Sequence, residues 1–199
     1  MTAARSAQMV HFGSVALAEE PAHSAVLSVI HAAKKASALI SYDPNLRFAL
    51  WDDPQRLKQI VLDTLPLADV IKVSEEEAEF LFGISDPEQA LCHMEETYDA
   101  KVLFVTCGSA GAWGSINGST AFVPAYQVRA VDTTGAGDCF LGAAAYQLLT
   151  TKKTLKSFNE KDVKALLRFA CAAGSLVTTK LGAIPAIPTK EEIFRCLEK

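Results

Sequence analysis

The stretch Asp132-Thr133-Thr134-Gly135-Ala136-Gly137-Asp138 decides the fold, and the apolar segment Cys139-Phe140-Leu141-Gly142-Ala143-Ala144-Ala145-Tyr146 follows it directly. This order of residues predicts a glycine-rich turn that opens a helix, whose first backbone amides lack intrahelical partners. The helix dipole is positive at the same end, so the turn is a candidate anion site. Asp138 stands at that site, where a carboxylate could take a proton from a hydroxyl that attacks a bound phosphate.

Simpler interpretations of this stretch are open on the residues alone. Asp138 could be a first-turn acid that only favours the helix dipole. A dinucleotide-binding fingerprint would need a further glycine at the position where Phe140 stands. A P-loop would need a Gly-Lys-Ser/Thr run, which the sequence does not contain.

The composition is that of an ordinary globular chain. The length of 199 residues predicts a single domain over residues 1–199, and the apolar share of 50% is enough for a full core. The 19 basic and 23 acidic residues form no basic stripe, which argues against a nucleic-acid partner. No apolar run is long enough for a membrane span, and the start Met1–Ser6 lacks the apolar segment of a secretory signal. The cysteines and histidines are scattered, so we expect no zinc site, no disulfide framework and a cytoplasmic location.

Apolar strands alternate with amphipathic helices along the chain. Strands are predicted at residues 8–14, 38–42, 68–73 and 101–106, and helices at 19–36, 54–65, 86–98, 160–178 and 189–197. Residues 112–123 are predicted to form a hairpin around Asn117-Gly118, a pair that favours a type I′ turn. This order predicts a mostly parallel sheet with helices on its faces, in a Rossmann-like three-layer α/β/α architecture.

The central stretch resembles the C-terminal signature of the ribokinase-like (PfkB-type) carbohydrate kinases, and the similarity runs over nearly all of the chain. The resemblance implies the ribokinase-like fold, ATP with Mg²⁺ as phosphoryl donor and a sugar as acceptor. It also implies that Asp138 is the catalytic base and that the amides of Gly135, Ala136 and Gly137 form the anion hole.

The segment Asp43-Pro44-Asn45-Leu46-Arg47 follows the predicted strand 38–42, at the strand end where open α/β sheets bind ligands. The residue types alone are also compatible with a plain turn and a solvated arginine. Together with the following Leu50-Trp51, however, the segment resembles the fructokinase and ketosugar kinase branch of the family. That resemblance implies that Asn45 and Arg47 lie near the substrate or its phosphate.

Ser74 and Glu77 have the spacing of a capping box, which alone could explain both residues. The segment Lys72–Glu79 also resembles the family's Asn-x-x-Glu element, which helps to place magnesium and phosphates. Ser74 stands where that element has Asn, whereas Glu77 keeps the Glu position. The resemblance therefore implies that both residues face ATP and that Glu77 contacts Mg²⁺ through water, since this ion prefers oxygen ligands.

Two further segments resemble family elements beside the nucleotide and a monovalent cation. The run 106–111 is similar to a Thr-x-Gly-x-x-Gly element near the adenosine, and the helix 160–178 borders the adenine in relatives. The implied ATP contacts there are Thr106, Gly108, Ser109, Gly111, Gly137 and Ala170. The loop 179–188 resembles the Gly-Ala-x-Pro-x-x-Pro loop, although Ala186 stands where some relatives have Ser. The implied ligands of a potassium ion are Asp132, Thr134, Val177, Lys180 and Gly182.

The resemblance begins at what would be the middle of a family member. The family's first strands, its Gly-Gly-Asn sugar-binding element and its small β-sheet lid have no counterpart in the 199 residues. We therefore expect a fructokinase-like sugar kinase in which these parts are missing, and a homodimer because an incomplete sheet leaves an unpaired edge. The alternatives are a catalytically silent nucleotide-binding or assembly module, and a kinase of a keto-deoxy sugar acid or a nucleoside.

Overall fold

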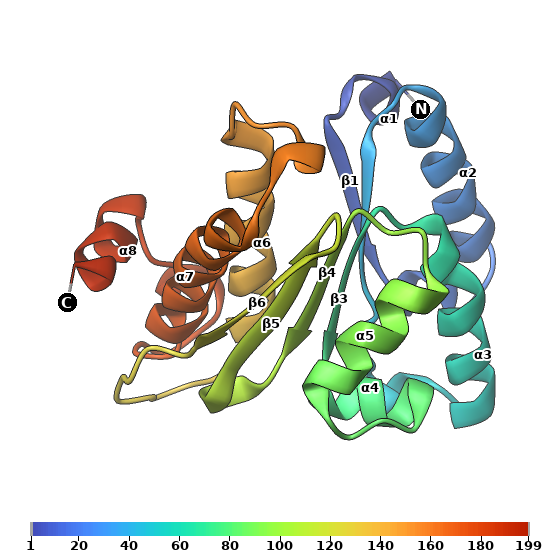
Figure 1. The fold of residues 1–199 in the computed structure, drawn as a ribbon. Helices are drawn as coiled ribbons and strands as arrows, with labels where there is room; N and C mark the ends of the chain where they lie inside the picture. The colour runs from blue at the N-terminus through green and yellow to red at the C-terminus, as the bar shows by residue number, and fades with distance from the viewer. Residues whose placement is uncertain (1, 199) are drawn as a thin grey trace. The chain divides into compact units, whose positions relative to one another are not determined.

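The computed structural model describes residues 2–198, so Met1 of the segment Met1–Ser6 lies outside the described residues. The chain divides into two compact units, unit 1 (Met1–Val105) and unit 2 (Thr106–Lys199). Figure 1 shows that unit 1 and unit 2 each combine strands with helices. The single domain expected from the composition stays a prediction.

Unit 1 carries β1 (Met9–Gly13), β2 (Leu39–Asp43), β3 (Val70–Ser74) and β4 (Val102–Thr106). The β1 and β2 strands are parallel, as are β2 and β3. Almost every residue of β2, β3 and β4 is buried, because helices cover a parallel sheet on its faces and leave no alternating polar positions. The polar residues Asp43 and Ser74 stand at the carboxyl ends of β2 and β3.

The helices of unit 1 are α1 (Thr2–Ser6), α2 (Ala22–Lys35), α3 (Pro54–Thr64), α4 (Glu75–Phe82) and α5 (Pro87–Thr97). Local sequence sets their starts, since Asp53 and Asp86 cap α3 and α5 and each is followed by proline. Ser74 and Glu77 form the predicted capping box of α4. The α2 helix packs on β1 and β2.

Unit 2 begins with the hairpin of β5 (Gly111–Ile116) and β6 (Ser119–Pro124), which pair antiparallel. Asn117 and Gly118 both have positive φ, at 50° and 78°, which confirms the predicted type I′ turn. The α6 helix (Ala136–Thr150) packs along α7 (Glu160–Val177), and α7 covers the hairpin and contacts α8 (Lys190–Leu197). Small residues permit the α6–α7 approach, because a Cβ added to Gly174 would lie 3.2 Å from the carbonyl oxygen of Ala136.

Parallel strands in unit 1 and the antiparallel hairpin in unit 2 confirm the mixed, mostly parallel α/β class. The predicted elements are present with ends shifted by at most three residues, the largest shift being at the start of α2. The sequence patterns did not indicate α1 or the single-turn 3₁₀ segments such as Phe48–Leu50, which are too short to show a period. Among residues 2–198, no helix is both long and apolar enough to cross a bilayer.

The start of α7 gives a pH-dependent prediction. Hydrogen bonds from the Lys153 ammonium and then from the Asn159 amide lower the pKa of the Asp162 carboxyl. A depressed carboxyl pKa adds stability that is present above the unfolded-state pKa and is lost as pH falls through the folded-state pKa. We therefore expect Asp162→Asn to lower the thermal midpoint more at pH 7 than at about pH 2, which lies below the ordinary carboxyl range. Thermal unfolding of both proteins across this range checks the expectation, and equal differences at both pH values would contradict it.

Candidate active site

A cavity of about 280 Å³ lies within unit 2. Its walls come from the segment before β5, from the chain after β6, from the turn and first turns of α6, and from α7. The lining residues are Thr106, Gly108, Ser109, Gly111, Ala125, Tyr126, Gln127, Val128, Ala130, Thr133, Ala136, Gly137, Phe140, Cys171, Gly174, Ser175 and Thr178. The structure thus brings together five of the predicted ATP contacts, namely Thr106, Gly108, Ser109, Gly111 and Gly137.

The remaining predicted ATP contacts lie elsewhere. Ala170 of α7 is fully buried and does not line the cavity, whereas Cys171 and Gly174 on the same helix do. Ser74 and Glu77 belong to unit 1. The sequence reasoning missed the wall formed by residues 125–128, whose backbone is held in place where Tyr126 N donates to Ser175 Oγ at 3.1 Å. That wall has no regular secondary structure, so no periodic sequence pattern could predict it.

The start of α6 has the geometry that the sequence motif predicts. Gly135 is the N-cap residue with φ of 81°, and no side chain caps the helix. Ala136 N donates to the carbonyl of Thr133, but in the described part of the chain the amides of Gly137 and Asp138 have no acceptor. Two free N–H groups at the positive end of a 15-residue helix can bind an anion such as a phosphoryl group.

Asp138 is the third residue of α6 and its side chain is exposed. An exposed carboxylate beside free amides can accept a proton from an incoming hydroxyl. The neighbouring Cys139 is a poor alternative, because burial first and the Asp138 charge second raise the pKa of its thiol to about 11. The thiol then stays protonated near neutral pH, and only a thiolate is a good nucleophile.

Asp132 joins the motif turn to the loop after α7. Its Oδ1 accepts the amide of Thr134 at 2.9 Å and its Oδ2 accepts the amide of Gly182 at 3.0 Å. Hydrogen bonds from Thr134 first, and then from Gly182, lower the pKa of this carboxyl. The amides of Val131 and Asp132 also donate to the carbonyl of Thr178.

The predicted potassium ligands would act mostly through backbone oxygens, and this site stays a prediction. Asp132, Thr134 and Gly182 are linked by the bonds of Asp132. Val177 is buried as the last residue of α7, and the Lys180 ammonium pairs with Glu192 at 3.3 Å. Among residues 2–198, no group of three His, Cys, Asp or Glu side chains is placed to hold a metal ion.

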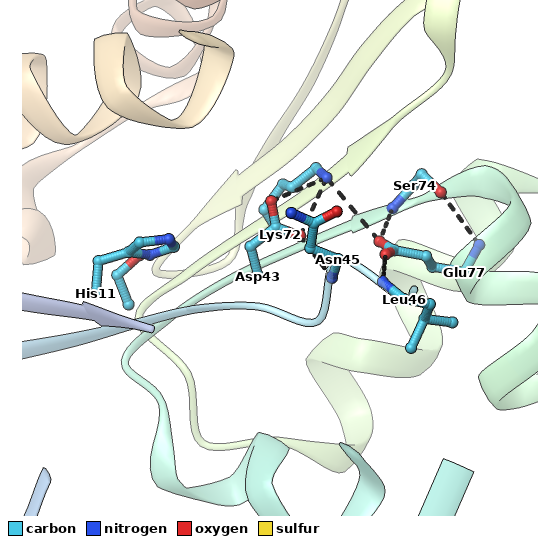
Figure 2. A network of polar contacts seen from close by, with 8 residues as sticks. His11, Asp43, Asn45, Leu46, Lys72, Ser74 and Glu77 are labelled. Atoms are coloured by element: carbon cyan, nitrogen blue, oxygen red, sulfur yellow. Dashed lines mark hydrogen bonds and ion pairs between the residues drawn. The ribbon is translucent and has the colours of Figure 1, made fainter. Parts of the chain in front are cut away.

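Unit 1 contains a second group of predicted site residues, which Figure 2 shows from close by. Glu77 Oε2 accepts the amide of Ser74 at 2.8 Å, and Glu77 Oε1 accepts the amide of Leu46 at 2.9 Å. Both carboxylate oxygens are thus engaged with the backbone, so a magnesium ion would meet Glu77 more readily through water than directly. Asn45 is half-buried and Arg47 is exposed in the turn after β2.

Sequence reasoning missed the cation in this group. Lys72 lies in β3 and donates to both oxygens of Asp43, at 3.2 and 3.1 Å. The signal was available, because a lysine within the apolar run Val70-Ile71-Lys72-Val73 must find a partner if the strand is buried on both faces. The identity of that partner could not be read from the chain.

Together, an α/β fold, a ligand-sized cavity and free amides with a carboxylate at a helix start define a phosphate-handling class of protein. The chain belongs to the pfkB family of carbohydrate kinases, whose family model matches residues 2–190. The ribokinase-like α/β fold that the sequence predicts is therefore confirmed. Fructokinase-1 of Zea mays is 40% identical over 195 residues, which are 98% of this chain and 60% of the relative. The chain thus spans about 60% of the length of the curated relatives it matches first.

The comparison with solved structures also finds fructokinases. The fructokinase from Vibrio cholerae O395, in a fructose-, ADP- and calcium-bound form, is 34% identical with a TM-score of 0.86. The similarity covers 96% of this chain and 61% of that one. A double mutant of the same enzyme, in a fructose-, ADP- and potassium-bound form, is 33% identical, also has a TM-score of 0.86 and covers 96% of this chain and 60% of that one.

Proposed function

We propose that this chain is an ATP-dependent sugar kinase that transfers the γ-phosphoryl group to a hydroxyl of fructose. The start of α6 carries the proposal, because the free amides of Gly137 and Asp138 can accept phosphoryl oxygens beside the exposed Asp138 carboxylate. The unit 2 cavity, which Gly137 also lines, is proposed to hold the nucleotide. The names of the relatives support fructose as the first acceptor to test.

In the proposed reaction, Asp138 takes the proton of the acceptor hydroxyl as its oxygen attacks the γ-phosphorus. Of the predicted anion hole, the Ala136 amide is engaged by Thr133, and the free amides of Gly137 and Asp138 stabilise the charge that grows on the equatorial phosphoryl oxygens. Such preorganised donors act mainly on the transition state, so they raise kcat more than they tighten substrate binding.

Metal ions have proposed positions on this chain's residues. Glu77 would contact Mg²⁺ through water, and Mg²⁺ would offset the negative charge of the phosphates. The Asp132–Gly182 link is proposed as the core of a potassium site, with oxygen donors from the loops 132–134 and 177–182. The potassium-bound form of the Vibrio cholerae double mutant supports this second assignment.

The experiment is ADP release by the 199-residue chain with ATP, Mg²⁺ and K⁺, offered fructose, ribose and a keto-deoxy sugar acid in turn. We expect turnover with fructose above both others. Turnover with the acidic sugar alone would transfer the proposal to that acceptor class, for which the exposed Arg47 is suited. ADP binding measured by calorimetry separates two failures. Binding without turnover indicates the silent nucleotide-binding module, and the absence of both overturns the proposal.

Two wider expectations accompany the proposal. A cytoplasmic location agrees with scattered cysteines that form no disulfide among the described residues. A homodimer agrees with the exposed apolar side chains of Leu181 and Ile184 in unit 2, since exposed apolar surface favours association. Light scattering at two protein concentrations tests the dimer independently of the activity.

A further inference from the structure

Lys72 is a buried charge for which the proposed reaction has no role. It is the central residue of β3, and only 6% of its surface is exposed. An ammonium group at such a position is costly unless carboxylates neutralise it and accept its protons. The contacts of Lys72 therefore indicate what the residue is for.

Two carboxylates from two other elements surround this ammonium. Asp43, at the end of β2, accepts from Lys72 Nζ with both oxygens at 3.2 and 3.1 Å. Glu77, in the first turn of α4, has its Oε2 at 3.9 Å from the same nitrogen. Both carboxylates are nearly buried, at 3% and 8% exposed, so one lysine serves two buried anions.

Each of these carboxylates also holds a backbone amide of the turn that follows β2. Asn45 N donates to Asp43 Oδ1 at 3.2 Å, and Leu46 N donates to Glu77 Oε1 at 2.9 Å. Figure 2 shows this chain of contacts from Lys72 through both acids to the turn. Two consecutive amides are thus fixed by acids that share one cation.

The turn needs such support because its conformation is not a favoured one. Asn45 has φ of 45°, a left-handed conformation that asparagine tolerates better than most residues but that still costs free energy. Without Lys72, the two buried carboxylates would repel each other and take up water. They would then release the amides of Asn45 and Leu46.

We propose that Lys72 is a positioning residue, which acts through Asp43 and Glu77 to hold the 43–47 turn and so presents Asn45 and Arg47 to the phosphoryl acceptor. The inference rests on the proposed function for the identity of the acceptor. The holding of the turn by Lys72 stands on the contacts alone. Lys72 itself touches neither substrate nor the reacting atoms.

The test compares Lys72→Met, a neutral side chain of similar length, with Lys101→Met. The Lys101 ammonium also forms an ion pair in unit 1, with Asp69 at 2.7 Å, but this pair is more exposed and makes no contact with the turn. We expect amide hydrogen exchange at residues 45 and 46 to speed up about ten-fold or more in Lys72→Met and to be unchanged in Lys101→Met. Amides of α5 serve as the reference, because a general loss of stability in unit 1 would speed their exchange as well.

A second variant keeps the test decisive if Lys72→Met does not fold. Gln has a single side-chain oxygen, so Glu77→Gln cannot accept from both Leu46 and Ser74 as Glu77 does. Glu77→Gln should therefore speed amide exchange at residue 46 or 74. Exchange at the amides of α5 should stay unchanged, because only one local hydrogen bond is lost. Unchanged exchange at the turn in both variants overturns the inference.

Steady-state kinetics then separate this inference from the proposed function. If the wild type turns over, Lys72→Met should raise KM for the acceptor about ten-fold, and clearly more than KM for ATP. An active wild type with unchanged acceptor KM in Lys72→Met overturns the positioning role alone. A wild type that releases no ADP with any acceptor overturns the proposed function, and the exchange data still decide whether Lys72 holds the turn.

Discussion

Asp138→Asn is expected to lower kcat for phosphoryl transfer by roughly a hundred- to ten-thousand-fold, the contribution typical of general-base catalysis by a positioned side chain. The asparagine amide keeps the size of the side chain but cannot take the acceptor proton. The free amides at the start of α6 belong to the backbone, so the substitution leaves them in place. Affinity for ADP, measured by calorimetry, should therefore stay within about three-fold of the wild type, a difference of less than 1 kcal/mol.

A matched control is available on the neighbouring helix. Glu160 is a first-turn acid of α7, and it is exposed in the same way as Asp138. If Asp138 acted only on its helix dipole, Glu160→Gln and Asp138→Asn would have similar, small effects on stability and none on kcat. A turnover number near the wild-type value in Asp138→Asn would remove Asp138 from the role of base.

The start of α6 could be predicted from the sequence because its chemistry is local. Gly135, Gly137 and Asp138 are neighbours in the chain, and the turn and helix they form depend little on the rest of the molecule. The Asn117-Gly118 turn was predicted for the same reason, since two residues with positive φ determine its type. The capping box of Ser74 and Glu77 is a third local feature.

The features that the sequence could not predict are all non-local. The second oxygen of Glu77 binds Leu46, which is 31 residues away, and Lys72 finds Asp43 across 29 residues. The cavity wall at residues 125–128 gains its place from Ser175 on α7. A resemblance to a family assigns a role to each matching residue separately. It therefore placed Ala170 at the nucleotide, whereas Cys171 and Gly174 of the same helix line the cavity and Ala170 is buried.

Gly111→Ala is expected to destabilise unit 2 by about 3 kcal/mol or more, which combines left-handed backbone strain with overpacking against a rigid neighbour. Gly111 has φ of 133°, and an added Cβ would lie 2.2 Å from the carbonyl oxygen of Val123 and 2.7 Å from the Cα of Pro124. Both atoms belong to the backbone of β6, which pairs with β5 in this register. The clash therefore cannot be relieved by a side-chain rotation, and the hairpin must open at the end that also lines the cavity.

Gly118→Ala isolates the conformational part of that effect. Gly118 also has positive φ, at 78°, but no atom lies within 4 Å of an added Cβ. Its substitution should cost only about 1 kcal/mol, from backbone strain alone. Urea denaturation followed by tryptophan fluorescence compares the two variants, because Trp113 lies in the same hairpin. If the midpoints of the two variants coincide, the close approach of β6 to Gly111 contributes nothing to stability and glycine is needed there only for its φ. A clearly lower midpoint for Gly111→Ala, with ADP binding reduced in parallel, would instead show that β5 and β6 must meet this closely for the cavity to form.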